Sequence, residues 1–132
     1  MTGNIYQIKL DDKLIGITKL EKADAPMGVA FGLMHLNDID SPFDFFKKYC
    51  EANKIVINEF DEKYGFIDTQ VIPNLKVLKT NGIEIKGYAG NAISGMKEEG
   101  YVITVYGIGY PFFEDEFPHH VKSYNEMFKD GK

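Results

Sequence analysis

The chain has 132 residues, a length typical of one domain, and we expect a single globular domain over residues 1–132. Its formal net charge is −5, and every cation apart from histidine is a lysine. Arginine is the preferred residue for bidentate contacts with phosphate and guanine, so its absence argues against nucleic-acid binding. The sequence contains no apolar run long enough to span a membrane, and residues 1–10 lack the apolar core of a signal peptide. We therefore expect a cytoplasmic protein that binds neither nucleic acid nor membrane.

The first part of the chain predicts three strands. Residues 5–10 alternate between apolar and polar side chains, and residues 14–20 form a partner strand after a turn at residues 11–13. Residues 28–36 are almost wholly apolar and carry two glycines, which favours a buried strand over a helix.

A helix start follows at Ser41. Serine is a good N-cap, Pro42 suits the first helical position, and Asp44 places a negative charge in the first turn. The pattern predicts a helix over about residues 42–53 with an apolar face that includes Cys50. This one cysteine allows no internal disulfide or multi-cysteine zinc site, and we expect a packed, unreactive thiol.

The middle of the chain predicts short strands at residues 55–57 and 65–71, separated by an exposed acidic loop at residues 59–64. This loop contains three carboxylates, Glu59, Asp61 and Glu62. Beyond it, the dipeptide Asn81-Gly82 predicts a two-residue type I′ turn, which would place Lys79 opposite Glu84.

The last part of the chain predicts a glycine-containing connection at residues 88–95, a turn at 97–100 and a central strand at 101–107. A C-terminal helix is expected over about residues 118–129, because apolar side chains repeat at helical spacing at Phe117, Val121, Tyr124 and Phe128. Hairpins dominate this order. The predicted fold class is therefore α+β, with a largely antiparallel sheet and two helices packed on one face or end.

We find no catalytic or cofactor motif. The glycines Gly90 and Gly95 have the spacing of a phosphate-binding loop, but Lys97 lies one place late and no serine or threonine follows it. His119 and His120 beside nearby carboxylates are the best candidates for a metal or acid–base site. Adjacent helical residues point about 100° apart, which places this pair badly for sharing one ion. We expect no catalytic residue, no cofactor and no bound metal.

A second acidic segment is interleaved with aromatic residues. Glu114, Asp115 and Glu116 lie beside Phe113 and just before the expected C-terminal helix. Carboxylates set among aromatic rings form a surface that would dock a basic partner, with rings as anchors and charges that steer the encounter.

In size, charge and the sequence of residues 110–120, the chain resembles bacterial immunity proteins. The resemblance implies a protein that neutralises a toxin, often a basic nuclease, by covering its active site with acidic side chains. The expected partner is thus a basic toxin domain, and the candidate contacts are Glu59, Asp61, Glu62, Phe113, Glu114, Asp115, Glu116 and His119. Two other interpretations stay open at this point: a small enzyme or metal-binding domain that uses His119 and His120, and a structural or self-associating domain.

Overall fold

A computed structural model of the chain describes residues 4–129, with side chains described through residue 127. Over this range the fold is α+β, as predicted, with an antiparallel sheet of nine strands and three α-helices. The strands are β1 (Tyr6–Leu10), β2 (Lys13–Thr18), β3 (Lys22–Asp24), β4 (Val29–Leu36), β5 (Ile57–Asp61), β6 (Phe66–Thr69), β7 (Leu75–Lys79), β8 (Gly87–Met96) and β9 (Gly100–Ile108). The helices are the 3₁₀ turn η1 (Ala25–Met27), α1 (Pro42–Ala52), α2 (Phe112–Glu116) and α3 (Pro118–Lys129).

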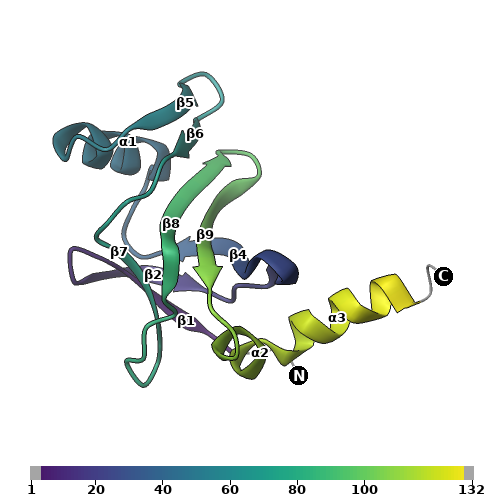
Figure 1. Ribbon diagram of the computed structural model, residues 1–132. Helices are drawn as coiled ribbons and strands as arrows, with labels where there is room; N and C mark the ends of the chain where they lie inside the picture. The colour runs from purple at the N-terminus through teal and green to yellow at the C-terminus, as the bar shows by residue number, and fades with distance from the viewer. Residues whose placement is uncertain (1–3, 130–132) are drawn as a thin grey trace.

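The strand order is β5-β6-β8-β9-β4-β2-β1-β7, and β3 pairs with β4 beside this path. Strand β4 joins the two halves of the sheet, because its first part pairs with β9 and its last residues pair with β2. Figure 1 shows α1, β5 and β6 gathered at one end of the molecule and α2 at the other, with α3 extending away from the body. The strand at residues 101–107 is central, as predicted.

The first hairpin forms as predicted between β1 and β2. Asp11 and Asp12 both have positive φ angles, 52° and 64°, as a type I′ turn requires. Alternate residues of β1 point inward, so Tyr6, Ile8 and Leu10 are all buried in the core.

Helix α1 begins where the sequence predicts. The Ser41 side chain accepts a hydrogen bond from the Asp44 backbone N–H at 3.3 Å, which satisfies one of the free donors at the helix start. Phe43, Phe46 and Cys50 lie one turn apart on its buried face. This face packs against the inner side of the sheet.

The predicted acidic loop at residues 59–64 is instead partly a strand. Glu59 and Asp61 belong to β5, which pairs with β6, and the turn begins only after Asp61. The expected exposure is confirmed, since Glu59 and Asp61 are both exposed. Strand β5 lies at the edge of the sheet, and neither of its faces is buried in the core. Its residues therefore need not be apolar, so the sequence lacks the alternating pattern that would predict a strand here.

The hairpin at Asn81-Gly82 forms, but the predicted register is wrong by one residue. Leu78, and not Lys79, forms the bridge to Glu84. A shift of one residue moves each side chain of a strand to the opposite face of the sheet.

The cause is a loop of three residues in place of two. The Lys79 N–H donates to the Ile83 carbonyl at 2.7 Å, and the Gly82 N–H donates to the Lys79 carbonyl at 2.8 Å. Gly82 has a φ angle of 92°, which is the geometry of a tight turn followed by a glycine bulge. The Asn81 side-chain oxygen also accepts from the Ile83 N–H at 3.1 Å and stabilises this loop. On the other edge of β7, Lys79 is paired with Tyr6 of β1, so these two side chains point to the same face of the sheet.

The predicted connection at residues 88–95 is wrong, because these residues form most of β8, the longest strand described. Glycine is unfavourable in strands, so the glycines of this segment favour a loop when the sequence is considered alone. In the structure a Cβ atom at Gly95 would overlap the Gly100 carbonyl oxygen, so glycine permits the close approach of β8 and β9.

The C-terminal helix α3 forms as predicted, with an additional short helix, α2, directly before it. Phe113 and Phe117 are one helical turn apart and both fully buried, and the Phe117 N–H donates to the Phe113 carbonyl at 2.8 Å. Val121 and Tyr124 are partly buried against the core, while the side chain of Phe128 lies outside the described residues.

Candidate functional site

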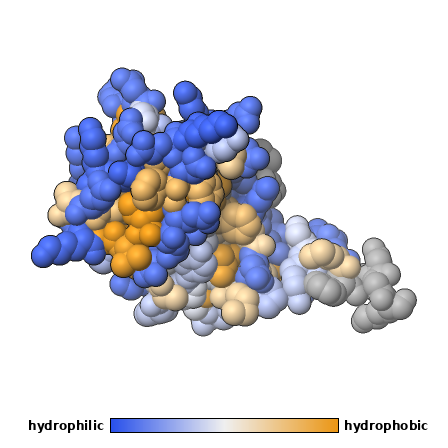
Figure 2. Space-filling view, turned by 90° about the horizontal axis from the view of Figure 1, so that it is seen from above, coloured by the Kyte–Doolittle hydropathy of each residue, from blue (hydrophilic) through white to orange (hydrophobic). Residues whose placement is uncertain are grey.

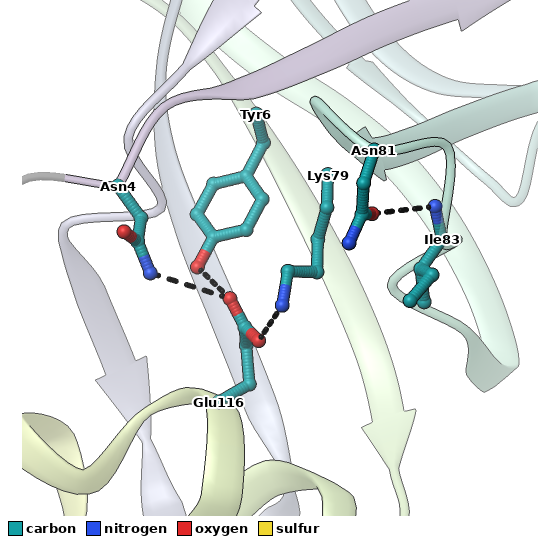
Figure 3. A network of polar contacts seen from close by, with 6 residues as sticks. All are labelled: Asn4, Tyr6, Lys79, Asn81, Ile83 and Glu116. Atoms are coloured by element: carbon teal, nitrogen blue, oxygen red, sulfur yellow. Dashed lines mark hydrogen bonds and ion pairs between the residues drawn. The ribbon is translucent and has the colours of Figure 1, made fainter.

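Glu116 lies inside a polar network rather than on the surface (Figure 3). Its carboxylate accepts hydrogen bonds from the Tyr6 hydroxyl at 2.7 Å and from the Asn4 amide at 3.4 Å. It also forms an ion pair with the Lys79 ammonium at 2.9 Å, and its side chain is only 8% exposed. The Glu116 carboxylate is therefore occupied by contacts within the protein, and little of it is accessible to a partner.

The network depends on the pairing of β1 with β7. Tyr6 and Lys79 are directly paired across β1 and β7, and both side chains reach the same carboxylate of α2. Burial raises the pKa of the Tyr6 hydroxyl, and the hydrogen bond to Glu116 raises it further, so Tyr6 remains a donor. Glu116 thus fastens α2 onto the two strands.

Of the other predicted contact residues around α2, one is buried and two are exposed. Phe113 is fully buried between Tyr110 and Phe117, with ring centroids 5.3 Å and 5.2 Å away, and offers no contact to a partner. Glu114 and Asp115 are exposed. This end of the molecule therefore keeps two of its three predicted carboxylates.

The two histidines pack against each other and against the aromatic cluster. Their ring centroids are 4.2 Å apart, and His120 also stacks on Phe117 at 5.5 Å. The His120 Nε2 atom is 2.8 Å from the Leu20 carbonyl oxygen. Burial lowers the pKa of His119, and its neighbour His120 lowers it further. Among the described residues, no three histidine, cysteine or acidic side chains are grouped as they would be to hold a metal ion.

Cys50 is fully buried on the inner face of α1, as expected. Burial raises its thiol pKa, and the nearby Glu51 carboxylate adds to this effect. A thiol with a raised pKa is a poor nucleophile, so its position favours packing.

The predicted acidic residues at the opposite end remain accessible. Glu59, Asp61 and Glu62 are all exposed on β5 and the turn that follows it. This turn lies beside the tip of the β8–β9 hairpin, because the Lys97 N–H donates to the Tyr64 carbonyl at 3.2 Å.

The adjacent hairpin tip adds two carboxylates that the sequence did not assign to any site. Glu98 and Glu99 are both exposed at this tip. In the sequence they belong to a simple turn, and only the pairing of β6 with β8 brings them near the β5–β6 turn. We call the resulting surface the acidic end, and it consists of Glu59, Asp61, Glu62, Glu98 and Glu99.

The carboxylates of the acidic end are not neutralised by close ion pairs. Within the described side chains, the ion pairs join Lys47 to Glu51 and Lys79 to Glu116, and none involves the acidic end. Figure 2 views the molecule from the side on which α1, β5 and β6 lie, and it shows apolar surface framed by hydrophilic side chains. The apolar side chains exposed in this region include Phe60, between Glu59 and Asp61.

A cleft of about 510 Å³ separates α1 from the β5–β6 turn. Carboxylates and lysines line it in equal number: Asp40, Asp44, Glu51 and Glu62 with Lys47, Lys48, Lys63 and Lys97. The mixed charge gives this cleft no preference for a ligand of either sign.

The predicted contacts therefore fall on two separate surfaces. The acidic end and the α2 region lie at opposite ends of the molecule (Figure 1). One compact partner contact would use one end or the other, and the acidic end has more free carboxylates.

No α-helix within residues 4–129 combines the length and the apolar character needed to cross a membrane. Comparison of the chain with protein-family models, with curated proteins and with solved structures gave no match.

Proposed function

We propose that this protein is a small binding protein of the immunity type, which neutralises a basic toxin domain in the bacterial cytoplasm by covering its active site. The observation that supports the proposal is the acidic end. There, two hairpin tips that are distant in sequence bring together five exposed carboxylates without close ion pairs among the described residues.

Carboxylates in this arrangement suit a basic partner on physical grounds. Exposed like charges that are close together produce a local negative potential, which speeds the encounter with a positively charged surface. At the active site of a nuclease, they would occupy the positions at which substrate phosphates bind. Lys63 and Lys97 are exposed on the same two turns, but the five carboxylates outnumber them, and the partner supplies the remaining counter-charges.

The exposed aromatic residues support the same function. Tyr64 and Phe60 are 53% and 46% exposed beside the carboxylates, and aromatic side chains commonly anchor protein interfaces. An acidic surface with apolar anchors is suited to a protein partner more than to a small ion.

We expect a toxin gene to lie beside the gene of this protein, and the purified toxin domain that it encodes provides the direct test. We expect the purified protein to bind that domain and to inhibit its activity at a one-to-one ratio. The affinity should fall steeply between low and physiological salt, because ions screen exposed charges over about 8–10 Å. Absence of binding, or binding that is indifferent to salt, would contradict the proposal.

A further inference from the structure

One face of the sheet carries apolar side chains although it points away from the core. Ile67, Ile93 and Ile103 point inward from β6, β8 and β9 and are almost completely buried. Side chains alternate along a strand, so Phe66 and Val102 point to the opposite face. We call this second surface the outer face.

The strand register aligns the outer face across four strands. Val102 on β9 pairs with Ser94 on β8 and with Leu33 on β4, and Ser94 pairs with Asp68 on β6. These four side chains form one row on a single face of the sheet. Leu33 is 38% exposed, which is high for a leucine in the interior of a strand.

The outer face is hollowed. A depression of about 430 Å³ opens over it, and the apolar side chains that line the depression are Phe31, Leu33, Phe66, Met96 and Val102. A volume of this size accommodates one or two large side chains from a partner.

Two carboxylates and one lysine lie at the rim of the depression, and the Glu21 carboxylate accepts a hydrogen bond from the Leu33 N–H at 3.0 Å. Glu21 and Glu99 line it, and Asp61 lies beside Phe66 in the strand register. The one lysine among its described lining residues is Lys22. Apolar residues inside a charged rim are the usual anatomy of a protein interface.

We propose that the outer face is the docking surface for the basic partner, which inserts an aliphatic or aromatic side chain into the depression and places lysine or arginine side chains around its rim. This proposal rests on the proposed function and adds where the partner binds. The outer face is continuous with the acidic end through Asp61 and Glu99, so charge attracts the partner and apolar contact retains it.

The rim charge selects this occupant over a second copy of the chain. Two copies that met through this face would bring two acidic rims together, and like charges at an interface oppose association. A basic partner instead supplies the opposite charge at Glu99 and Asp61.

The test measures binding of the expected toxin domain to Leu33→Gln and Val102→Gln. Each substitution places an amide in the depression, and we expect each to weaken the affinity by about tenfold or more. Met27→Gln is the matched control, since Met27 is 68% exposed on η1, away from the depression, and should bind like the wild type. Thermal unfolding of each variant verifies that it is folded. If Val102→Gln is unstable, Leu33→Gln tests the proposal alone, because Leu33 is at the more exposed position.

The possible outcomes separate the two proposals. If both outer-face variants bind like the wild type while a Glu62→Gln, Glu98→Gln, Glu99→Gln variant binds weakly, the outer face is wrong and the proposed function stands. If the wild type does not bind the toxin domain, the proposed function fails and this inference fails with it. If sedimentation shows a wild-type dimer that Leu33→Gln dissociates, the occupant is a second copy and the inference is overturned.

Discussion

Glu116→Ala is expected to lower the free energy of unfolding by about 3 kcal/mol, because it leaves Lys79 without its counter-charge and the Tyr6 hydroxyl without its acceptor. Removal of one member of a buried ion pair generally costs 3–5 kcal/mol. The lower end applies here, since the Lys79 side chain is 33% exposed and can reach water. Chemical denaturation of the two proteins measures the difference.

Glu114→Ala is the matched control for this change. Glu114 lies on the same short helix, but it is exposed and outside the network, so its loss should have little effect on stability. The double variant Glu116→Ala, Lys79→Ala should lose less stability than the sum of the two single variants. Equal effects of the Glu116 and Glu114 substitutions would show that the network does not fasten α2.

Phe117→Ala is expected to destabilise the protein by about 3–5 kcal/mol. Phe117 is fully buried at the junction of α2 and α3, and its ring lies 5.9 Å from Tyr6, 5.2 Å from Phe113 and 5.5 Å from His120. Its removal leaves a cavity that these rings are unable to fill without moving both helices.

Phe60→Ala provides the comparison, because Phe60 is 46% exposed, makes a tilted ring contact with Phe43 and has the Lys47 ammonium 5.0 Å from its ring centroid. Its loss should cost about 1–2 kcal/mol. Denaturation midpoints for the two variants test the difference. If Phe117→Ala were no more destabilising than Phe60→Ala, the aromatic junction would not hold α2 and α3 in place.

Elements with strong local chemistry could be predicted from the sequence. The Ser41-Pro42 helix start and the alternation in residues 5–10 are specified by neighbouring residues alone, and both form as expected. Strand β8 could not be predicted, because its glycines allow close contact with distant segments rather than a turn: Gly87 and Gly95 lie against β9, and Gly90 lies against Val71.

The hairpin after β7 differs from the predicted register, and Lys79 forms its ion pair with a residue distant in the sequence. A two-residue turn would have paired Lys79 with Glu84, which satisfies local charge. In the structure Glu84 lies opposite Leu78, and Lys79 instead forms an ion pair with Glu116, a residue that the sequence places in a different segment. Rules for pairing neighbouring strand residues contain no information about an ion pair between Lys79 and Glu116.

The same limit applies to the candidate site. The sequence identifies the exposed carboxylates of β5 but groups Glu116 with Glu114 and Asp115, although only Glu116 is buried. It also gives no reason to join Glu98 and Glu99 to the acidic end, since the pairing of β6 with β8 sets their position.

Affinity for the proposed toxin partner, measured for variants of the two ends, tests most directly which surface binds. One variant carries Glu62→Gln, Glu98→Gln and Glu99→Gln, and the other carries Glu114→Gln and Asp115→Asn. Both sets of residues are exposed, so neither variant should unfold the protein. We predict that the first variant loses affinity by about tenfold or more and that the second binds within about twofold of the wild type. The opposite order would place the interface at α2 and contradict the account given for the acidic end.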